Sequence, residues 1–375
     1  MWLGLDDTDS LSGGCTTLVF HELLNNLPCE YGTPCLVRLW PFAARRTRGN
    51  AALAVEIQGF DGIEEWLDNY WRLNILPLKG EITSSEHDDR KQYPSDPGMV
   101  LFSEKPAAEV YWNAVRGEST FVEGGKQWGG HGRIGAAAAC AWPQENHTWE
   151  GIAWREGERF VDPDALEKVD NIEGTFMCRD PRTNRGLISP RGPCPVMFGV
   201  RAVTKSIAEE STKILINSSA KTLGSRIFIT NQATWDHIEE CSSHIVENKK
   251  MMKGGHIVIN DSIISFSEGG PVNLITQFLE IGDKFSILAL KFEEMLHIEA
   301  IKVLESVNRS RPKCSCGTTM KSLGKNQGIR CPNCRVTDDD KWVYQERIPP
   351  FEGWVQPEYD SRRHLAGDLV KNPKW

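Results

Sequence analysis

Residues 2–10 read Trp-Leu-Gly-Leu-Asp-Asp-Thr-Asp-Ser, and residues 13–17 read Gly-Gly-Cys-Thr-Thr. The first part predicts a short apolar strand that ends in three carboxylates, those of Asp6, Asp7 and Asp9. Apolar residues at helical spacing then predict a helix over 15–25. Carboxylates this close repel one another unless solvent, backbone N–H groups or a cation such as Mg²⁺ offsets their charge. The pattern therefore predicts a strand, an acidic loop containing glycines, and a helix.

Two interpretations of this acidic loop remain open. A helix N-terminus presents free N–H groups and a positive dipole, which suits Mg²⁺ held between the carboxylates and a bound phosphate. The alternative is a solvated acidic turn that precedes a helix. The sequence has no Walker-type Gly-Lys-Ser/Thr ending that would decide between them.

The composition indicates a globular chain with several domains. A length of 375 residues is too great for one ordinary hydrophobic core. Hydrophobic residues make up 40% of the chain, yet no apolar run is long enough to span a membrane and no secretory leader is evident. We therefore expect a cytoplasmic protein with no membrane partner. The net charge of −8 argues against a surface that binds polyanions everywhere.

A basic loop follows the second expected strand, which covers 34–40. Residues 44–51 read Ala-Arg-Arg-Thr-Arg-Gly-Asn-Ala, and a strand over 52–57 and a helix over 63–73 come next. Arginines beside a glycine suit phosphate oxygens, although a solvated loop is the better interpretation of this segment taken by itself. With the acidic loop in the same domain, these arginines could neutralise phosphates while the carboxylates hold Mg²⁺.

The middle of the chain alternates between α and β patterns. We expect the polar segment 81–96 to be a loop or a domain junction, and a glycine-rich run to lead into a small-residue helix near 133–142. The other expected elements are strands at 99–102, 148–155, 187–189 and 196–202 and helices at 107–115 and 163–169. This order predicts an α+β sandwich.

Short alternating strands are expected after residue 212, at 213–217, 226–231, 256–260 and 285–292. They predict a small β barrel of the OB kind, a fold that commonly holds single-stranded nucleic acid. Many small barrels have other functions, so the pattern favours nucleic acid only modestly.

Proline and glycine punctuate residues 187–201, which read Leu-Ile-Ser-Pro-Arg-Gly-Pro-Cys-Pro-Val-Met-Phe-Gly-Val-Arg. A rigid loop of this kind leaves carbonyl groups unpaired, and these could accept hydrogen bonds from a guanidinium or ammonium group. Phe198 could add a cation–π face. A structural turn is the alternative.

Four cysteines in two close pairs predict a zinc site. Fourteen residues separate Cys314-Ser-Cys316 from Cys331-Pro-Asn-Cys334. Four thiolates fill the tetrahedral coordination of zinc, so we expect a structural role and no catalysis at the metal. Residues 306–335 contain seven Lys and Arg and no Asp or Glu, which indicates a basic knuckle suited to RNA.

Motifs in one consistent order cover essentially the whole chain. They are Gly4-Leu-Asp-Asp-Thr-Asp-Ser10 with Gly14-Cys-Thr-Thr17, Thr47-Arg-Gly-Asn-Ala-Ala52, Arg133-Ile-Gly-Ala-Ala137, Ile188-Ser-Pro-Arg-Gly-Pro-Cys-Pro-Val196, Thr230-Asn-Gln232, Met320-Lys-Ser-Leu-Gly-Lys-Asn-Gln-Gly328 and Arg362-Arg-His-Leu365. Together they resemble the archaeal tRNA-isoleucine 2-agmatinylcytidine synthetases. The resemblance implies a multidomain α+β chain: a kinase-like ATP-binding α/β domain (1–95), a ferredoxin-like domain (96–205), a tRNA-binding OB-fold (206–305), a zinc ribbon (306–340) and a C-terminal tail (341–375).

The resemblance also implies a reaction. Family members break ATP down to AMP and phosphorylate the carbon-2 carbonyl oxygen of the wobble cytidine in isoleucine tRNA with a CAU anticodon. Phosphorylation is needed because oxide is a poor leaving group. Agmatine then displaces phosphate to give 2-agmatinylcytidine, so that the tRNA reads AUA.

The roles that the resemblance implies can be assigned residue by residue. Asp6, Asp7 and Asp9 would hold Mg²⁺ and ATP, with Arg48, Gly49 and Asn50 completing that site. Thr16 would relay or position the phosphoryl group, with Thr17 as the alternate. Agmatine would lie near Pro195, Val196, Phe198 and Gly199, its guanidinium on carbonyls or an unidentified carboxylate. Lys321 and Lys325 would contact tRNA, and Cys314, Cys316, Cys331 and Cys334 would bind zinc.

Two other classes of function remain open. One is a non-catalytic RNA-binding protein built from the barrel and the ribbon. The other is a related ligase that uses a different amine, because the sequence alone does not identify the amine.

Overall fold

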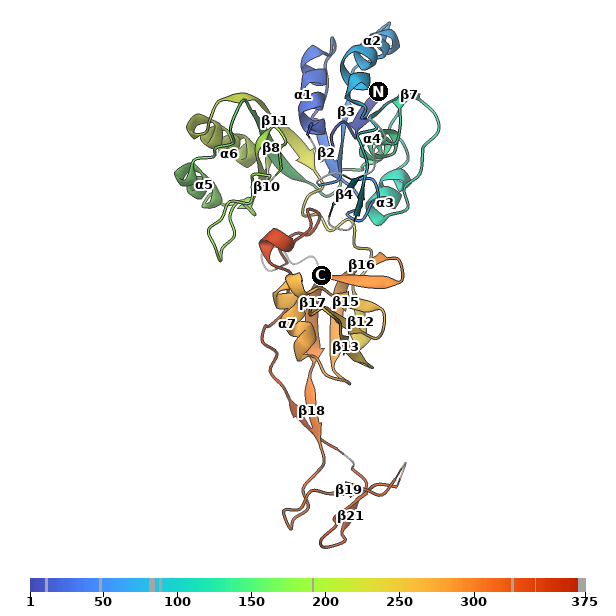
Figure 1. Cartoon of the computed structure of the whole chain (residues 1–375), viewed down its shortest axis with the longest axis vertical. Helices are drawn as coiled ribbons and strands as arrows, with labels where there is room; N and C mark the ends of the chain where they lie inside the picture. Colours follow the sequence, from blue (N-terminus) through green and yellow to red (C-terminus); the bar gives the residue numbers. More distant parts are fainter. Residues whose placement is uncertain are drawn as a thin grey trace. The chain divides into compact units, whose positions relative to one another are not determined.

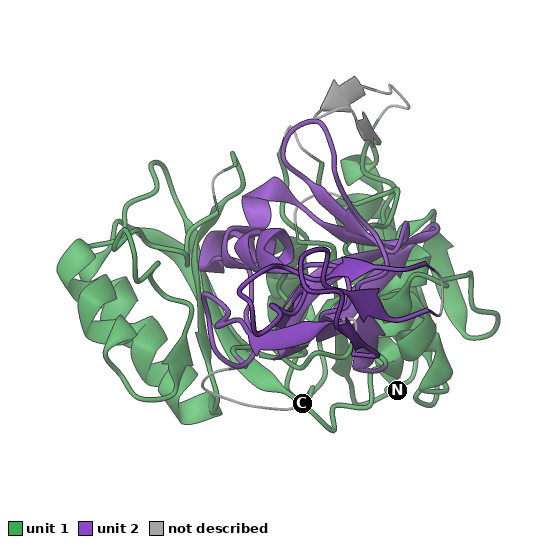
Figure 2. Ribbon diagram, turned by 90° about the horizontal axis from the view of Figure 1, so that it is seen from below, with its two compact units in different colours: residues 1–239, 363–368 green, residues 240–362, 369–375 purple. Residues whose placement is uncertain are grey.

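The computed structural model describes residues 1–10, 13–46, 49–80, 85–87, 90–190, 192–324, 327–340 and 342–369. The chain divides into two compact units (Figure 2). Unit 1 consists of residues 1–239 together with 363–368, and unit 2 contains the other residues from 240 onward. The segment near the end of the chain therefore belongs to the unit formed by its beginning.

A nine-stranded sheet runs through the described part of unit 1, in the order β7-β6-β1-β3-β2-β11-β8-β10-β9. Its strands are β1 (Trp2–Asp6), β2 (Cys35–Arg38), β3 (Ala51–Glu56), β6 (Gly98–Phe102), β7 (Lys126–Gly129), β8 (Thr148–Arg155), β9 (Thr175–Phe176), β10 (Val196–Ala202) and β11 (Thr222–Thr230). Neighbouring strands are antiparallel except β2 and β11, which pair in parallel. That parallel pairing makes one continuous sheet from early and late segments of the chain.

The helices of unit 1 cover both faces of this sheet. They are α1 (Thr16–Asn26), α2 (Ile63–Tyr70), α3 (Glu109–Arg116), α4 (Gly132–Ala141), α5 (Pro163–Asp170) and α6 (Lys205–Ser218). Apolar residues of α1 and α2 share a core with Leu3, Leu5 and Val55 on one face. Helices α3 and α4 pack together over β3 on the other face, and α5 and α6 lie beside β8 (Figure 1). The helix α2 continues as a π-helical turn over Trp71–Ile75.

Helix α4 approaches the sheet through glycine. A Cβ at Gly4 of β1 would lie 2.5 Å from the carbonyl oxygen of Ala136 in α4, and a Cβ at Gly98 would collide with the backbone near Arg133. Most of α4 is buried, including the alanine run 136–139. Close packing of a small-residue helix on a sheet therefore accounts for Gly4 of β1 and Gly98 of β6.

One expected strand is wrong because proline prevents it. Residues 187–189 lie in a loop and form no strand. Pro190, Pro193 and Pro195 follow closely, and proline lacks the N–H group that a paired strand needs. Ile188 instead accepts a single backbone hydrogen bond from Gly199 of β10, at 2.7 Å.

A second expected strand, at 213–217, is wrong because these residues belong to α6. The hydroxyl group of Thr204 caps this helix by accepting a hydrogen bond from the N–H of Ile207 at 3.4 Å. The buried residues Ala208, Thr212 and Leu215 follow at helical spacing. The strand expected at 226–231 is present within β11, but it pairs with β2 and β8 of unit 1 and with no later strand.

Unit 2 holds, among its described residues, a six-stranded sheet in the order β12-β16-β17-β15-β14-β13. Its elements are β12 (Ser242–Ile245), β13 (Lys249–Met251), β14 (Ile257–Ile259), β15 (Ile263–Ser265), α7 (Pro271–Phe278), β16 (Lys284–Phe292) and β17 (Met295–Glu305). Strands were expected at 256–260 and 285–292, and both are confirmed. The residues of α7 share one core with the strands, around Ile275, Phe285 and Ile301.

A ribbon of short strands completes unit 2. Its strands are β18 (Val307–Ser310) paired with β22 (Val343–Glu346), and β19 (Lys321–Ser322), β20 (Ile329–Arg330) and β21 (Thr337–Asp338) in one small sheet. In unit 1, the polar segment 81–96 contains the hairpin strands β4 (Ser85–His87) and β5 (Arg90–Gln92). In the part of the chain that the structure describes, no helix has both the length and the apolar character needed to cross a membrane.

Candidate active site

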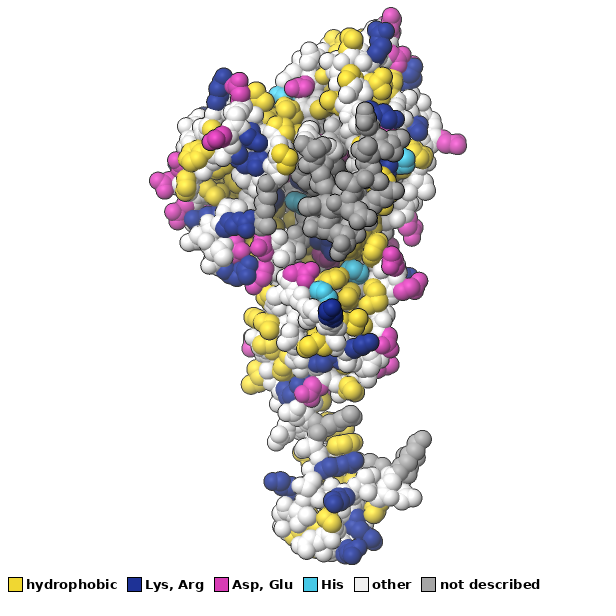
Figure 3. Space-filling view, viewed as in Figure 1, with side chains coloured by type: hydrophobic (Ala, Val, Ile, Leu, Met, Phe, Trp, Pro, Cys, Tyr) yellow, Lys and Arg dark blue, Asp and Glu magenta, His cyan; other side chains and the backbone are white. Residues whose placement is uncertain are grey.

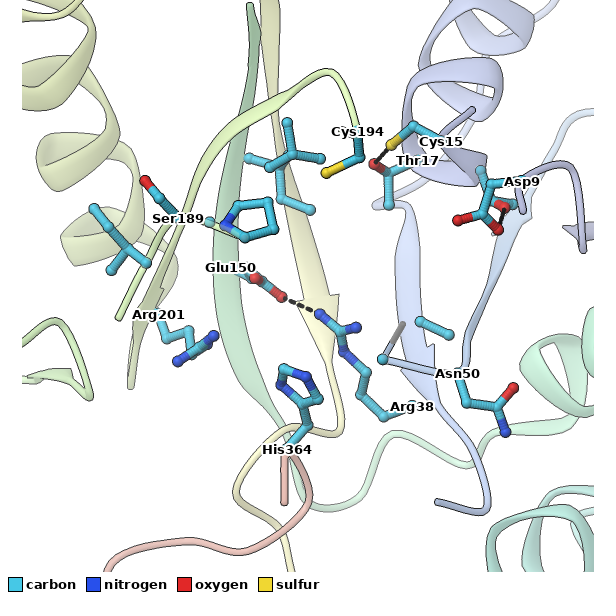
Figure 4. A pocket seen from close by; sticks show the side chains of 18 of the residues that line it. Asp9, Cys15, Thr17, Arg38, Asn50, Glu150, Ser189, Cys194, Arg201 and His364 are labelled. Carbon is cyan, nitrogen blue, oxygen red and sulfur yellow. Dashed lines mark hydrogen bonds and ion pairs between the residues drawn. The ribbon is translucent and has the colours of Figure 1, made fainter. Parts of the chain in front are cut away.

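A pocket of about 260 Å³ lies in unit 1 (Figure 4). Its walls come from the start of α1, residues 49–51 at β3, the strand β8, the loop 187–194 with β10, and His364 near the end of the chain. Of the residues predicted for the site, Asp9, Thr16, Thr17, Gly49, Asn50, Val196 and Gly199 line this pocket. The fold thus brings part of the predicted phosphate-binding set and part of the predicted amine-binding segment to one place.

The two threonines at the start of α1 have different partners. The hydroxyl group of Thr16 donates to a carboxylate oxygen of Asp9 at 3.3 Å and accepts from the backbone N–H of Thr8 at 3.4 Å. The hydroxyl group of Thr17 instead accepts from the indole N–H of Trp154 at 3.1 Å and lies 3.0 Å from the sulfur of Cys15. Of the two, only Thr16 therefore has a carboxylate positioned to receive its proton.

Asp6 and Asp7 do not line the pocket. The Asp6 carboxylate accepts the backbone N–H of Asp7 at 2.7 Å and packs so closely on α4 that a Cβ at Gly135 would overlap it. Burial, with the charge of Asp7, raises the pKa of Asp6 well above its ordinary value. Burial also raises the pKa of Asp7 to about 7, although the charge of Arg45 opposes this shift. Both carboxylates thus lie where added positive charge is favourable.

These carboxylates do not form a complete metal site by themselves. Among the described residues, three or more possible ligand atoms of His, Cys, Asp or Glu converge only at the four cysteines of unit 2. Carboxylate oxygens are nevertheless the ligands that Mg²⁺ prefers, and Mg²⁺ usually takes the rest of its ligands from water and phosphate. The residues present therefore fit Mg²⁺ as part of a nucleotide complex.

The basic loop is only partly visible in this site, because Arg48 lies outside the described residues. Asn50 lines the pocket in a left-handed conformation (φ 41°) and donates to the carbonyl oxygen of Trp40 at 2.7 Å. Arg45 stacks over the ring of Tyr93 at 4.6 Å, and Arg46 donates to the carbonyl oxygen of Ala43 at 2.7 Å. Neither of these two arginines lines the pocket.

The sequence did not predict the basic and acidic pocket residues Arg38, Glu150, Arg201 and His364. A guanidinium nitrogen of Arg38 lies 3.4 Å from the buried Glu150 carboxylate, which also accepts a hydrogen bond from the side chain of Gln232. Asn231 binds the backbone of Arg38 through hydrogen bonds of 2.7 and 2.8 Å. The motifs 230–232 and 362–365 were the signals that could have directed attention to this cluster.

Two of the four predicted amine-binding residues line the pocket, and the other two do not. Val196 and Gly199 line the pocket, and a Cβ at Gly199 would overlap the Glu150 carboxylate. Phe198 is fully buried in the core with Ala153 and Leu215, so it offers no cation–π face to the pocket. Pro195 does not line the pocket, and its carbonyl group accepts from the backbone N–H of Arg155 at 2.8 Å.

The carbonyl groups of the proline-rich loop do bind a guanidinium, but it comes from the chain itself. Arg159 donates to the carbonyl oxygens of Pro190 at 2.6 Å, Cys194 at 2.7 Å, Val196 at 2.8 Å and Gly192 at 3.1 Å. These bonds hold the loop against β10. The carbonyls expected to bind a ligand are thus already engaged, whereas Glu150 faces the pocket (Figure 4).

The four cysteines of the ribbon are brought together as predicted. Their sulfur atoms lie within 4.8 Å of one another, with 3.2 Å between Cys314 and Cys334 and 3.5 Å between Cys316 and Cys331. A tetrahedral zinc with bonds of about 2.3 Å keeps its sulfur ligands about 3.8 Å apart. The donor set and its spacing therefore fit a structural zinc ion.

The ribbon carries both basic and acidic residues, so it is less positively charged than residues 306–335 alone predict. Lys321 is exposed on β19, and Lys325 lies outside the described residues. Figure 3 shows Lys and Arg side chains gathered over the ribbon on the face in view. However, β21 pairs with β20 and places Asp338 opposite Ile329, next to Arg330. The acidic residues 338–340 thus offset part of the positive charge.

Comparisons with known proteins agree with this architecture. The models for the TiaS TCKD domain, the TiaS FLD domain and the TiaS C-terminal zinc ribbon domain match residues 2–69, 130–237 and 311–347. TiaS of Methanopyrus kandleri, named as a 2-agmatinylcytidine synthetase of an isoleucine tRNA, is 31% identical over 97% of this chain and 95% of its own length. The chain belongs to the TiaS family.

Further relatives and a solved structure extend this result. TiaS of Pyrobaculum neutrophilum is 30% identical over 91% of this chain and 89% of its own length. The crystal structure of TiaS in complex with its isoleucine tRNA, AMPCPP and agmatine is 21% identical, covers 99% of this chain and 97% of the solved chain, and superposes with a TM-score of 0.72. This chain therefore has the TiaS fold, with its zinc ribbon, and the predicted family is confirmed.

Proposed function

We propose that this chain is an ATP-dependent tRNA-modifying ligase that makes 2-agmatinylcytidine at the wobble position of isoleucine tRNA with a CAU anticodon. The TiaS relatives that it matches over nearly their whole length carry that activity in their names. The observation that carries the proposal is the pocket of unit 1, which joins the Thr16–Asp9 pair to the segment of β10 that contains Val196 and Gly199.

The first step of this reaction transfers a phosphoryl group from ATP to the cytidine oxygen. Asp6, Asp7 and Asp9 would hold Mg²⁺, which neutralises phosphate charge when it is bound. Arg48, Gly49 and Asn50 would complete the nucleotide site. Thr16 would relay or position the phosphoryl group, because its hydroxyl group has Asp9 as a proton acceptor. Thr17, bound to Trp154, would support the start of α1.

The second step brings agmatine to the same pocket. Glu150, whose carboxylate also contacts Arg38 and Gln232, would bind its guanidinium group beside them, next to Val196 and Gly199. Phe198 and Pro195 would not contact agmatine. They would support β10 and the proline-rich loop, which line the pocket. Charge-assisted hydrogen bonds to a buried carboxylate select a guanidinium over a simple ammonium group, because a planar fork matches two oxygens.

Unit 2 would bind the tRNA. We assign the kinase-like, ferredoxin-like and OB-fold architectures to the regions 1–95, 96–205 and 206–305, followed by the zinc ribbon 306–340 and the tail 341–375. The sheet of unit 1 includes β6, which lies after the boundary at residue 95. It also includes β11, which lies after the boundary at residue 205. Lys321 and Lys325 of the ribbon would contact tRNA phosphates. The cytoplasm, where tRNA is modified, is the proposed location.

The test is mass spectrometry of the wobble nucleoside. The full-length protein is incubated with the tRNA and ATP, and with agmatine, putrescine or lysine in separate reactions. We expect an agmatine adduct and release of AMP that depends on tRNA. An adduct with another amine alone would show a related ligase, and tRNA binding without AMP release would show a non-catalytic RNA-binding protein.

A further inference from the structure

The motif 362–365 places a histidine in the pocket of unit 1. The backbone N–H groups of Ala233 and Trp235 donate to the carbonyl oxygens of His364 and Leu365, both at 2.9 Å. The side chain of Leu365 is buried in the core of unit 1, and the neighbouring Arg363 stacks over the ring of Phe42 at 4.3 Å. These contacts fix His364 among the pocket residues, where its ring points toward Arg38 (Figure 4).

A chain of hydrogen bonds sets which imidazole nitrogen carries the proton. The side-chain nitrogen of Gln232 donates to Glu150, so its oxygen faces the Nδ1 atom of His364, at 3.3 Å. An amide oxygen can only accept a hydrogen bond, and therefore Nδ1 must be the protonated nitrogen. The Nε2 atom is then left with its lone pair, and it has no hydrogen-bond partner among the described residues.

The surroundings keep this second nitrogen accessible and unprotonated. A Cβ at Gly49 would overlap the guanidinium of Arg38 and lie 3.1 Å from Nε2, so glycine there lets both side chains lie against the backbone. The surrounding protein, together with the charges of Arg38 and Arg201, lowers the pKa of His364 well below its ordinary value. Glu150 acts in the opposite sense, but its charge is already balanced by Arg38. The side chain of His364 is exposed, so solvent and substrate can reach its ring.

We propose that Nε2 of His364 is the general base of the amine-transfer step, an inference that rests on the proposed function. The amine uses its lone pair to form the bond to carbon 2 of the phosphorylated cytidine. The bond between carbon 2 and oxygen breaks, and its electron pair leaves with the phosphate. The nitrogen becomes more acidic as it bonds to the ring, so a weakly basic neutral imidazole can take its proton.

The variant His364→Asn tests this role. Asparagine keeps a donor for Gln232 near the Nδ1 position and removes the basic Nε2. In single-turnover reactions of the full-length protein, we expect agmatine transfer to slow by about 10²–10⁴-fold, the usual contribution of a general base. Consumption of ATP that depends on tRNA should remain, and the acidic limb in the pH profile of the transfer step should disappear. When hydroxylamine is offered in place of agmatine, the variant should transfer it at a rate much closer to that of the wild type. The hydroxylamine adduct is acidic enough to lose its proton to water without a base from the protein.

Controls separate this role from a structural one. His147→Gln changes an exposed histidine of unit 1 that bonds the carbonyl of Gln144 and contacts the ring of Trp149, and it should leave transfer unchanged. His364→Gln is a second variant that also removes the basic nitrogen. The melting temperature of every variant shows whether it is folded. Transfer at the wild-type rate in His364→Asn, or equal loss of ATP consumption and transfer, would overturn the proposal. If neither His364 variant folds, the wild-type protein provides the test. A pH profile of its transfer step that has no acidic limb overturns the proposal. A wild-type protein that never forms the agmatine adduct would instead refute the proposed function.

Discussion

The hydroxyl group of Thr16 lies 3.3 Å from a carboxylate oxygen of Asp9 and donates a hydrogen bond to it. The two residues belong to the two halves of one motif, the acidic loop after β1 and the first turn of α1. A carboxylate in this position can accept the proton when the hydroxyl oxygen attacks or positions a phosphoryl group. The hydroxyl group of the neighbouring Thr17 instead accepts from Trp154 and lies beside the sulfur of Cys15, and among the described residues it has no carboxylate partner.

The two threonines should therefore respond differently to replacement by valine, which keeps their shape. We expect Thr16→Val to lower tRNA-dependent ATP turnover by about 10²–10³-fold, as loss of a group that acts in the transition state does. Thr17→Val should keep most of the turnover and lower stability by about 1 kcal/mol, the usual contribution of one hydrogen bond. Turnover and denaturant unfolding measured on both variants would check this, and the reverse ranking would assign the role to Thr17.

The ionised carboxylate of Asp7 should lower the stability of the folded chain, although the proposed reaction needs its charge. Its pKa is about 7 in the folded protein, above the ordinary value of 3.8, so the folded state binds the proton more tightly than the unfolded state. Stability should then fall as pH rises from about 4 to about 7. We expect Asp7→Asn to melt at a higher temperature than the wild type above pH 7, with little difference near pH 4.

The same Asp7→Asn variant should lower Mg²⁺-ATP turnover by orders of magnitude, because asparagine removes the charge that a cation needs. Mg²⁺ and ATP together should raise the melting temperature of the wild type more than that of the variant. Normal turnover in the variant would contradict the assignment of Asp7 to the Mg²⁺ site.

The zinc ribbon should be separable from the nucleotide site. Cys331 is a buried member of the cysteine cluster in unit 2, whereas the pocket is built from unit 1. In the full-length variant Cys331→Ser, we expect zinc content and tRNA affinity to fall together while ATP binding is retained. Metal analysis, tRNA titration and ATP titration measure the three quantities. Loss of ATP binding would show that the ribbon also supports unit 1.

The basic residues of the ribbon should set the salt dependence of tRNA binding. Replacing Lys321 and Lys325 by alanine should weaken binding and reduce the slope of log affinity against log salt by about one unit per lost phosphate contact. The maximum rate at saturating tRNA should change little, because these residues position the substrate. Lys221→Ala is a matched control in unit 1, where Lys221 is paired with Glu156. A double variant that keeps its slope but loses maximum rate would place the knuckle in the active site.

Local patterns predicted many of the elements but not their partners. The zinc site was predictable because its ligands lie in two short motifs whose spacing reflects a tight turn. The pattern failed for α6, because residues 213–217 alone predict a strand, whereas the cap at Thr204 begins a helix that includes them. It also failed for Phe198, because a bulge between β8 and β10 at Val196 and Phe198 changes the regular alternation of faces that a strand pattern assumes.

The sequence by itself determined the strand, acidic loop and helix at residues 2–26, the cysteine cluster and the family, since each depends on residue types at short, fixed spacing. Only the tertiary structure decided that Arg38, Glu150 and His364 meet in one pocket. Those residues come from β2, β8 and a segment near the end of the chain. Their meeting depends on the parallel pairing of β2 with β11 and on the return of residues 363–368 to unit 1. Contacts of this kind follow from the order of strands in the folded sheet, which no local pattern of residues specifies.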